Sequence, residues 1–410
     1  MSEVPPAVTV RAIAAGGDGV ATLPDGRTVF IPRAAPGDRV RVRDVELHAR
    51  FARAEIGELL EPGPGRTAPP CPHYVADYCG GCQLMHLSPA VQLSVKARIV
   101  GDALRRIARL DVGDPEIVPS AAPFGYRTKV TFTMQEGRLG YHRANRAARV
   151  FDVHECLIAD DEVRALHAGL RGARQYLPQR DARVVLRIDR AHGRHVMVLT
   201  AAGDAWTGGP PLHRALLHSG LTAAVWWQPE GGQARVVAGA DTPWPATVFE
   251  QVHPAMGRTV RAAALDALGP VAGVAVWDLY AGIGESSAEL AARGATVDSV
   301  EADVRAVRLA ESLGPSGPRR HAGLVEDAVA TLPPPQLILT NPPRTGMAQR
   351  ATNAIMQAGA DRIAYVSCDP ATLGRDIARL SAGYQLASIR AFDQFPQTAH
   401  VECLAVLQRR

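Results

Sequence analysis

The C-terminal part of the chain alternates short apolar runs with stretches of helical periodicity. From about residue 246 the apolar runs are "VAVWDLYAGIG", "ATVDSVEAD", "QLILTNPPR", "RIAYVSCDP" and "VECLAVLQ". Apolar strands that alternate with helices predict a parallel sheet with helical crossovers. We therefore expect a doubly wound α/β domain of the Rossmann type over residues 241–410. In such a domain the ligand site lies at the carboxyl ends of the strands.

The N-terminal part has a different pattern, in which apolar and polar residues alternate in short runs. Turn sequences such as "AAGGDG" and "PDGR" separate these runs. Several short strands in so few residues predict a small β-barrel of the oligonucleotide-binding type over residues 1–62. Its second half is rich in arginine, at Arg33, Arg39, Arg41, Arg43, Arg50 and Arg53. These side chains form either a solvated strand face or a face that contacts RNA, and the pattern leaves both possibilities open.

Between these two units, residues 63–240 predict a central α+β domain, which makes the chain multidomain. A helical periodicity covers residues 89–112, and strand-like runs such as "YRTKVTFTM" and "RVVLRID" follow it. We expect the 89–112 helix to pack on the C-terminal domain, although it lies earlier in the chain.

Composition narrows the class of protein. No run of about 18 apolar residues occurs, so we expect no membrane partner. The N-terminus lacks a basic region followed by an apolar one, which predicts a cytoplasmic protein. The net charge of +4 comes almost entirely from arginine, since Lys96 and Lys129 are the only lysines. Arginine suits phosphate recognition, but a GC-rich genome explains the same ratio.

A glycine-containing turn follows the first of the C-terminal strands. The motif Asp278-x-Tyr280-x-Gly282-x-Gly284 opens a helix, and the next strand ends at Glu301. Glycines let the backbone approach a ligand closely, and an acidic residue at this distance can hold ribose hydroxyls. The third glycine of a dinucleotide motif is absent and the acidic Asp278 precedes the turn, a combination that resembles the first motif of class I S-adenosylmethionine methyltransferases. The alternative is a tight turn of an unrelated α/β domain.

Three polar groups stand at later strand ends. "NPPR" places Asn341 after the fourth strand, "YVSCDP" places Cys368 before a helix start, and "HVE" places Glu402 at the start of the last strand. A position before a helix N-terminus lowers the pKa of a thiol and predicts a nucleophile. The alternative is a small buried residue. Cys403, the neighbour of Glu402 on the strand, should face the core.

The remaining cysteines have the spacing of metal ligands. Cys71-x7-Cys79-x2-Cys82 lies in one loop, with two glycines inside "YCGGC" and Cys156 farther along the chain. A reducing compartment makes ligands more plausible than disulfides. The spacing alone suits zinc and an iron–sulfur cluster equally.

Together these motifs resemble the RNA uracil-C5 methyltransferase family, which makes 5-methyluridine in rRNA and tRNA. The resemblance covers nearly the whole chain and is most specific in "NPPRTG", "YVSCDPATLGRD", "HVE" and "VFEQVHPAM". It implies a TRAM domain at the N-terminus and a [4Fe–4S] cluster on the four cysteines. It also implies that Cys368 is the nucleophile that adds to uracil C6 and that Glu402 is the base that removes the C5 proton.

The resemblance also supplies the remaining site residues. Gln251 matches a family glutamine that helps to hold S-adenosylmethionine and substrate. The residues expected at the cofactor are therefore Gln251, Asp278, Tyr280, Gly282, Gly284, Glu301 and Asn341. Basic residues mixed with Tyr126, Phe132 and Tyr141 suit a single-stranded RNA surface. The residues expected to contact RNA are Arg127, Lys129, His142 and Arg344.

Asn341 departs from the family, which normally has aspartate there. "NPP" is also a signature of amino-group methyltransferases, which need no cysteine. A second alternative is an RNA-binding relative without activity. We predict a monomeric enzyme that acts on 23S rRNA, with the T-loop uridine of tRNA as the alternative target.

Overall fold

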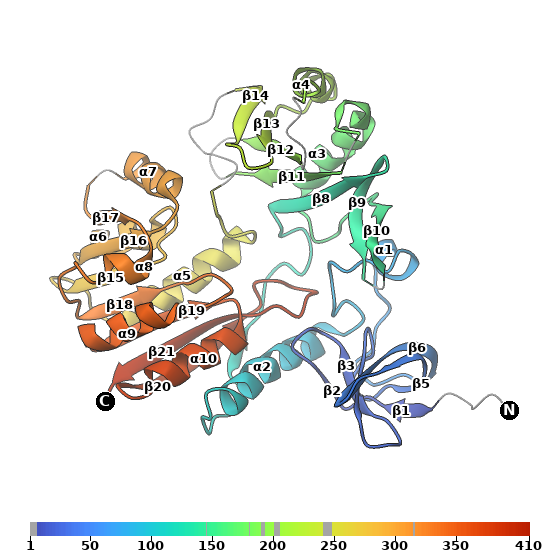
Figure 1. The fold of residues 1–410 in the computed structure, drawn as a ribbon, viewed down its shortest axis with the longest axis horizontal. Coiled ribbons are helices and arrows are strands. Elements are labelled where there is room, and N and C mark those ends of the chain that lie inside the picture. The colour runs from blue at the N-terminus through green and yellow to red at the C-terminus, as the bar shows by residue number, and fades with distance from the viewer. Residues whose placement is uncertain are drawn as a thin grey trace.

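A computed structural model of the chain describes residues 6–144, 146–179, 181–189, 193–200, 206–240, 248–314 and 316–410. Three β-sheets follow one another along the sequence (Figure 1). The boundary predicted between residues 240 and 241 lies outside the described residues. No helix in the described part of the chain is long and apolar enough to cross a membrane.

The N-terminal unit is a six-stranded sheet with the order β1-β5-β6-β4-β3-β2. Its inner face is apolar, with Val29, Ile31 and Val40 fully buried. Alternation along each strand places the apolar side chains on one face and the charged ones on the other. The strands are β1 (Ala7–Thr9), β2 (Ala12–Ile13), β3 (Gly19–Thr22), β4 (Thr28–Ile31), β5 (Arg39–Leu47) and β6 (Phe51–Glu61).

The central unit is a seven-stranded sheet with the order β10-β9-β8-β11-β12-β13-β14. Helices α3 (Asp161–Gly172) and α4 (Gly209–His218) cover one face and share a core with it. The short helices α1 (Pro72–Ala76) and η1 (Arg174–Tyr176) lie in the connections. The strands are β8 (Lys129–Gln135), β9 (Arg138–Arg143), β10 (Arg146–Asp152), β11 (Ala182–Ile188), β12 (Arg194–Thr200), β13 (Ala224–Pro229) and β14 (Arg235–Ala238).

The aromatic surface expected on this unit is not formed. Tyr126 and Phe132 are only 4% and 1% exposed. Phe132 faces inward on β8 and stacks on His167 of α3, and Tyr126 donates to the carbonyl of Pro396. The prediction that these rings stack on RNA bases was therefore wrong, because core packing uses them.

The C-terminal unit is an eight-stranded sheet with the order β17-β16-β15-β18-β19-β21-β20-β7. Strands β15 to β19 pair in parallel and β21 is antiparallel to its neighbours. The strands are β7 (Glu116–Val118), β15 (Ala275–Leu279), β16 (Thr296–Glu301), β17 (Arg319–Ala322), β18 (Leu337–Thr340), β19 (Arg362–Ser367), β20 (Tyr384–Phe392) and β21 (Glu402–Arg409).

Helices cover both faces of this sheet, as the doubly wound prediction requires. One apolar core lies under α5 and a second under α9 and α10. The helices are α5 (Pro254–Leu268), α6 (Glu285–Ala292), α7 (Val304–Leu313), α8 (Val325–Ala328), α9 (Gln349–Ala358) and α10 (Pro370–Leu380).

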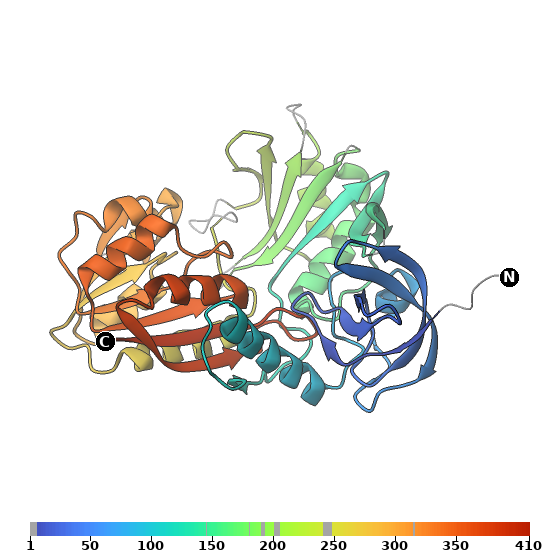
Figure 2. The ribbon, with the colours of Figure 1, turned by 60° about the horizontal axis from the view of Figure 1, so that its bottom comes forward.

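An earlier segment of the chain completes this unit. Helix α2 (Pro89–Arg106) packs on α10 (Figure 2). Strand β7 pairs in parallel with β20 and forms the edge of the sheet. Gly374 allows the close approach, since a Cβ there would lie 3.2 Å from the carbonyl oxygen of Ala103 on α2. The helix is shorter than the range 89–112, because the backbone leaves helical geometry after Arg106 and Arg109 has a positive φ of 56°.

Candidate active site

The turn between β15 and α6 has the geometry of a ligand-binding loop. Tyr280, Gly282 and Gly284 have φ values of 60°, 58° and 76°. A side chain at Gly282 would enter open space, so the turn leaves room beside its backbone. The buried Asp278 accepts hydrogen bonds from the hydroxyls of Ser286 and Ser287 at the start of α6. Burial raises the pKa of Asp278 to about 6.

Glu301 ends β16 on the other side of the same turn. One carboxylate oxygen accepts from the backbone N–H of Gly282 at 2.9 Å, and the other accepts from Asp303 at 2.7 Å. The carboxylate predicted for ribose therefore lies at the glycine turn. The structure thus brings together the group Asp278, Tyr280, Gly282, Gly284 and Glu301.

Cys368 and Glu402 meet at neighbouring strand ends. Cys368 follows β19, and the cap of α10 begins at Asp369, whose side chain accepts from the N–H of Thr372 at 2.9 Å. Strands β19 and β21 are antiparallel, with Ser367 opposite Cys403. One further step in this register places Cys368 opposite Glu402. Cys403 is fully buried in the apolar core, as expected.

The pKa of the Cys368 thiol differs from the sequence-based prediction. The helix N-terminus was expected to lower its pKa, but the pKa is raised. Burial has the largest effect and the neighbouring Glu402 adds to it, because both disfavour a thiolate. Arg344 opposes the shift through its charge and a hydrogen bond to the thiol. Burial also raises the pKa of Glu402 to about 8, again opposed by Arg344.

Asn341 and Arg344 follow β18 at the same sheet edge. Both are exposed, and the backbone N–H of Asn341 donates to the carbonyl of Leu279 on the neighbouring strand β15 at 3.2 Å. Arg344 was expected to contact RNA, and the structure places it beside both Cys368 and Glu402. The charge of Arg344 lowers the pKa of both the thiol and the carboxyl that the sequence singled out.

Gln251 reaches the site from the segment before α5. Its side-chain carbonyl accepts a hydrogen bond at 3.1 Å from Gln394, which lies just beyond β20. Gln394 is fully buried and sequence reasoning missed it, because nothing local marks it. His253 caps α5 by accepting from the N–H of Met256 and also contacts Ser120 at 2.8 Å.

The residues expected to contact RNA divide between two places. Arg127 lies toward the active site, since desolvation lowers the pKa of His400 and the charges of both Arg344 and Arg127 lower it further. Lys129 is half-buried; burial and then Arg187 and Arg127 lower its pKa. His142 is exposed on β9, with Nε2 at 3.1 Å from the hydroxyl of Thr133.

The four spaced cysteines gather in one region. Cys71, Cys79 and Cys156 each raise the pKa of Cys82, after burial as the main cause. Burial raises the pKa of Cys79 to about 11, and the nearby Cys156 and Cys71 add to the shift. Among the described residues, however, no three His, Cys, Asp or Glu side chains are arranged to hold a metal ion.

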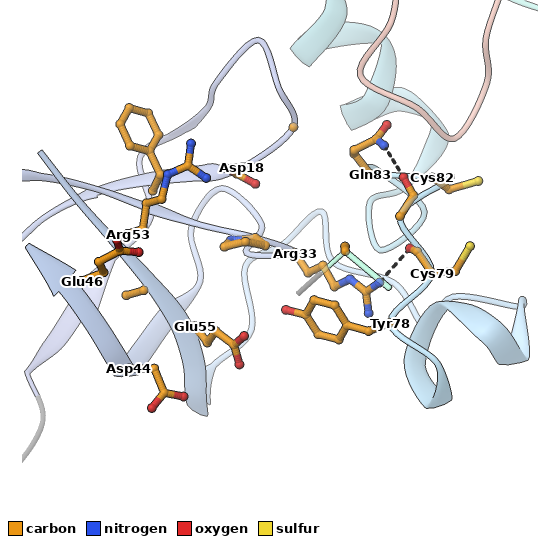
Figure 3. Close-up of a pocket in the computed structure, with 16 residues that line it drawn as sticks. Asp18, Arg33, Asp44, Glu46, Arg53, Glu55, Tyr78, Cys79, Cys82 and Gln83 are labelled. Atoms are coloured by element: carbon orange, nitrogen blue, oxygen red, sulfur yellow. Dashed lines mark hydrogen bonds between the residues drawn. The ribbon is translucent and has the colours of Figure 1, made fainter. Parts of the chain in front are cut away.

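Arg33 joins the cysteine loop to the N-terminal unit. Its guanidinium lies 3.7 Å from the ring centre of Tyr78 and donates to the carbonyl of Cys79 at 3.0 Å (Figure 3). A cavity of about 400 Å³ lies between the two units at this place. The side chains of Cys79 and Cys82 point away from Arg33 in Figure 3.

Comparison with known proteins places these features in a family. A family model described as tRNA (Uracil-5-)-methyltransferase matches residues 332–410, and a TRAM domain model matches residues 7–56. A 23S rRNA (uracil(1939)-C(5))-methyltransferase RlmD of Thiobacillus denitrificans is 30% identical, over 98% of this chain and 100% of its own. An uncharacterized RNA methyltransferase of Gloeobacter violaceus is 31% identical, over 98% and 96%.

A solved structure supports the same fold. The tRNA (uracil-54, C5)-methyltransferase of Pyrococcus abyssi, in complex with S-adenosyl-L-homocysteine, superimposes with a TM-score of 0.75. The match covers 98% of this chain and 100% of that one, at 20% identity. At this identity the likeness concerns the fold.

Proposed function

The chain belongs to the RNA uracil-C5 methyltransferase family, and we propose that it methylates a uridine of 23S rRNA through a covalent adduct on Cys368. The observation that carries this proposal is the register of β19 and β21, which sets Cys368 opposite Glu402 beside Arg344. An amino-group methyltransferase would need no cysteine thiol.

Each residue has a chemical task in this reaction. Uracil C5 is a weak nucleophile, so Cys368 Sγ first adds to C6 and the ring becomes an enolate. C5 then attacks the methyl group of S-adenosylmethionine, and the methyl–sulfur bond breaks. Glu402 removes the proton from C5, and elimination across C5 and C6 releases Sγ. Arg344 stabilises negative charge on both the thiolate and the carboxylate.

The raised pKa values call for a charge partner in the bound state. Without ligands, burial favours the neutral forms of Cys368 and Glu402. The methyl donor carries a positive sulfonium, which favours both anions when it lies close. We propose that donor binding, together with Arg344, ionises the pair only when the methyl group is in place. The donor itself would lie at the Gly282 turn, with Glu301 at its ribose.

We also propose that Cys71, Cys79, Cys82 and Cys156 hold a [4Fe–4S] cluster. The support is their mutual electrostatic influence and the glycines between Cys79 and Cys82. A [4Fe–4S] cluster is bound by four thiolates. Because the cluster is larger than a single metal ion, its four ligands lie farther apart than the ligands of one ion. Protein purified without oxygen should be brown and contain iron and sulfide. Colourless protein with stoichiometric zinc would reject the cluster.

The choice of 23S rRNA rests on the curated relatives. Two relatives named as 23S rRNA methyltransferases match nearly the whole chain at 30% identity. A TRAM domain at the N-terminus is consistent with an RNA substrate. The T-loop of tRNA remains the second candidate, favoured by the description of the family model at residues 332–410.

The decisive assay uses radiolabelled S-adenosylmethionine with separate 23S rRNA-fragment and tRNA transcripts, followed by nucleoside analysis. We expect label in 5-methyluridine of the rRNA fragment, and a loss of at least about a thousandfold in Cys368→Ala. Cys403→Ala is the matched control, because that thiol faces the core. Label found only in tRNA would assign tRNA as the substrate. Activity in Cys368→Ala would contradict the covalent adduct on Cys368.

A further inference from the structure

The connection between β20 and β21, residues 393–401, ends directly at Glu402 and is buried except at Phe395 and the exposed His400. Among its members Gln394 and Val401 are fully buried and Thr398 is 2% exposed. Connections usually run over the surface, because their backbone polar groups need water. This one runs from the catalytic sheet toward the cysteine loop and α2 (Figures 1 and 2). The backbone N–H and C=O groups of its buried residues must therefore form hydrogen bonds with other groups of the protein.

Gln92 of α2 holds the middle of the 393–401 connection through two hydrogen bonds. Its Nε2 donates to Oε1 of Gln397 at 3.0 Å, and its Oε1 accepts from the backbone N–H of Gln397 at 3.1 Å. Gln397 has a positive φ of 70°, a conformation that non-glycine residues adopt at a cost. Such a conformation persists where the surroundings enforce it. Gln92 is only 5% exposed, so water does not replace this pair.

The cysteine loop provides a second attachment. The N–H of Leu84 donates to the carbonyl of Gln397 at 2.9 Å, and Oε1 of Gln83 accepts from the N–H of Ala399 at 3.3 Å. Gln83 and Leu84 directly follow Cys82 in the chain. At the other end of the connection, the fully buried Lys96 pairs with Asp393.

The two ends of the connection carry groups of the proposed site. Gln394 donates to Gln251, which fixes the Gln251 carbonyl and leaves its amide N–H groups for a ligand. Gly257 supports this arrangement, since a Cβ there would lie 3.0 Å from Cβ of Gln251. Val401 leads into Glu402 at the far end. A shift of the connection would thus move both Gln251 and Glu402.

We propose that Gln92 and Gln83 are positioning residues for the methyl-transfer reaction, acting through the 393–401 connection on Glu402 and Gln251. This inference rests on the proposed function. A misplacement of about 1 Å at a reacting group can cost about a hundredfold in rate. Side chains on α2 and on the cysteine loop, both far from Glu402 in the sequence, therefore set the geometry of the base on β21.

The test compares wild type with Gln92→Met, which keeps the volume and removes both hydrogen bonds to Gln397, together with the one that Nε2 donates to the carbonyl of Leu87 at 2.9 Å. Kinetics use whichever RNA the wild type methylates. We expect kcat to fall about tenfold to a hundredfold, with KM for RNA and for S-adenosylmethionine within about twofold of wild type. Backbone hydrogen exchange at Gln397 and Ala399 should become faster. Gln385→Met, an exposed site on β20, is the matched control and should leave all these quantities unchanged.

Further variants keep the test decisive. The double variant Gln92→Met with Gln397→Met should lose no more kcat than Gln92→Met alone, because the two side chains act as one unit. If Gln92→Met does not fold, Gln83→Met replaces it in the test. We expect the same pattern for Gln83→Met, with a smaller fall in kcat. A folded variant with unchanged kcat, or with the loss confined to KM, would overturn the inference. If the proposed RNA target is wrong, the wild type itself will methylate another RNA. If the inference is wrong, the ratio of kcat between Gln92→Met and wild type will stay near one.

Discussion

At the scale of single residues, the site is an acid and a thiol that share one cation. Burial holds the pKa of Glu402 at about 8 and raises that of Cys368, and Arg344 opposes both shifts. A buried carboxyl of this kind suits a proton acceptor that works near neutral pH, because it holds a proton firmly once it has taken one. The ligand-free site thus favours the neutral forms, and binding must supply positive charge.

Glu402→Gln should be inactive yet more stable than wild type. The folded state holds a proton on Glu402 up to about pH 8, whereas the unfolded chain releases it near the ordinary glutamate pKa of 4.5. Its raised pKa therefore costs stability as pH rises through this window. We expect turnover to fall at least about a hundredfold. The gain in melting temperature should grow between about pH 5 and 8 and then level off.

Thermal unfolding of Glu402→Gln and wild type across this pH range is the measurement. Asp278 also has a raised pKa, but it is common to both proteins and cancels in the difference. A gain that is the same at every pH would mean that the carboxyl is not protonated in the folded state.

Asn341→Asp tests whether asparagine impairs the site. Asn341 is exposed, and its backbone is fixed by the hydrogen bond to Leu279, which does not depend on the side chain. An amide can accept and donate as a positioning group without charge. We expect kcat to stay within about threefold of wild type. A much larger rise in turnover, measured with the same RNA, would show that the natural residue limits the enzyme.

At the scale of elements, strand pairing decides what the arginines of the N-terminal unit do. Arg39, Arg41 and Arg43 of β5 pair with Glu61, Glu58 and Glu55 of β6 at 2.8, 3.2 and 3.0 Å. Arg33 instead stacks on tyrosines of the cysteine loop. Cross-strand neutralisation favours the solvated strand face over the RNA-contacting face for the three β5 arginines.

Replacing Arg39, Arg41 and Arg43 together by glutamine should therefore change little. Exposed ion pairs contribute roughly 0–1 kcal/mol each and are screened by salt. We expect a small loss in the free energy of unfolding and an RNA affinity within about threefold of wild type, measured by filter binding at several salt concentrations. A clear fall in affinity together with a shallower salt dependence would assign these side chains to phosphate contacts.

At the scale of the whole molecule, the catalytic sheet is completed by a segment from before the central unit. Val100 and Leu104 of α2 are fully buried in the same core as α9 and α10. Strand β7 covers the edge of β20. The unit that carries the proposed chemistry is thus discontinuous in sequence, and the 393–401 connection ties it to the cysteine loop as well.

A fragment of residues 248–410 should not fold stably alone. It lacks the apolar face of α2 and leaves β20 as an open edge, which favours aggregation. We expect the fragment to be recovered mainly as aggregate, and residues 84–410 to show a cooperative thermal transition by circular dichroism. A cooperative transition of the short fragment at the temperature of the full chain would contradict this.

Sequence alone determined the features that depend on neighbours in the chain. The helix start after Cys368, the glycine turn after β15 and the placement of Cys368 and Glu402 at strand ends follow from local patterns and proved correct. The α/β organisation followed in the same way, because hydrophobic periodicity reports which side of each element is buried. The family resemblance added the roles of these residues, which remain proposals.

Only the tertiary structure decided how distant segments act on one another. The register of β19 against β21 brings Glu402 to Cys368, and burial there reverses the expected shift of the thiol pKa. Phe132 is buried in the core and does not form a surface for RNA. The hydrogen bond between Gln92 and Gln397 joins residues 305 positions apart. Desolvation and long-range hydrogen bonds depend on the whole chain surrounding a group, so no local pattern encodes them.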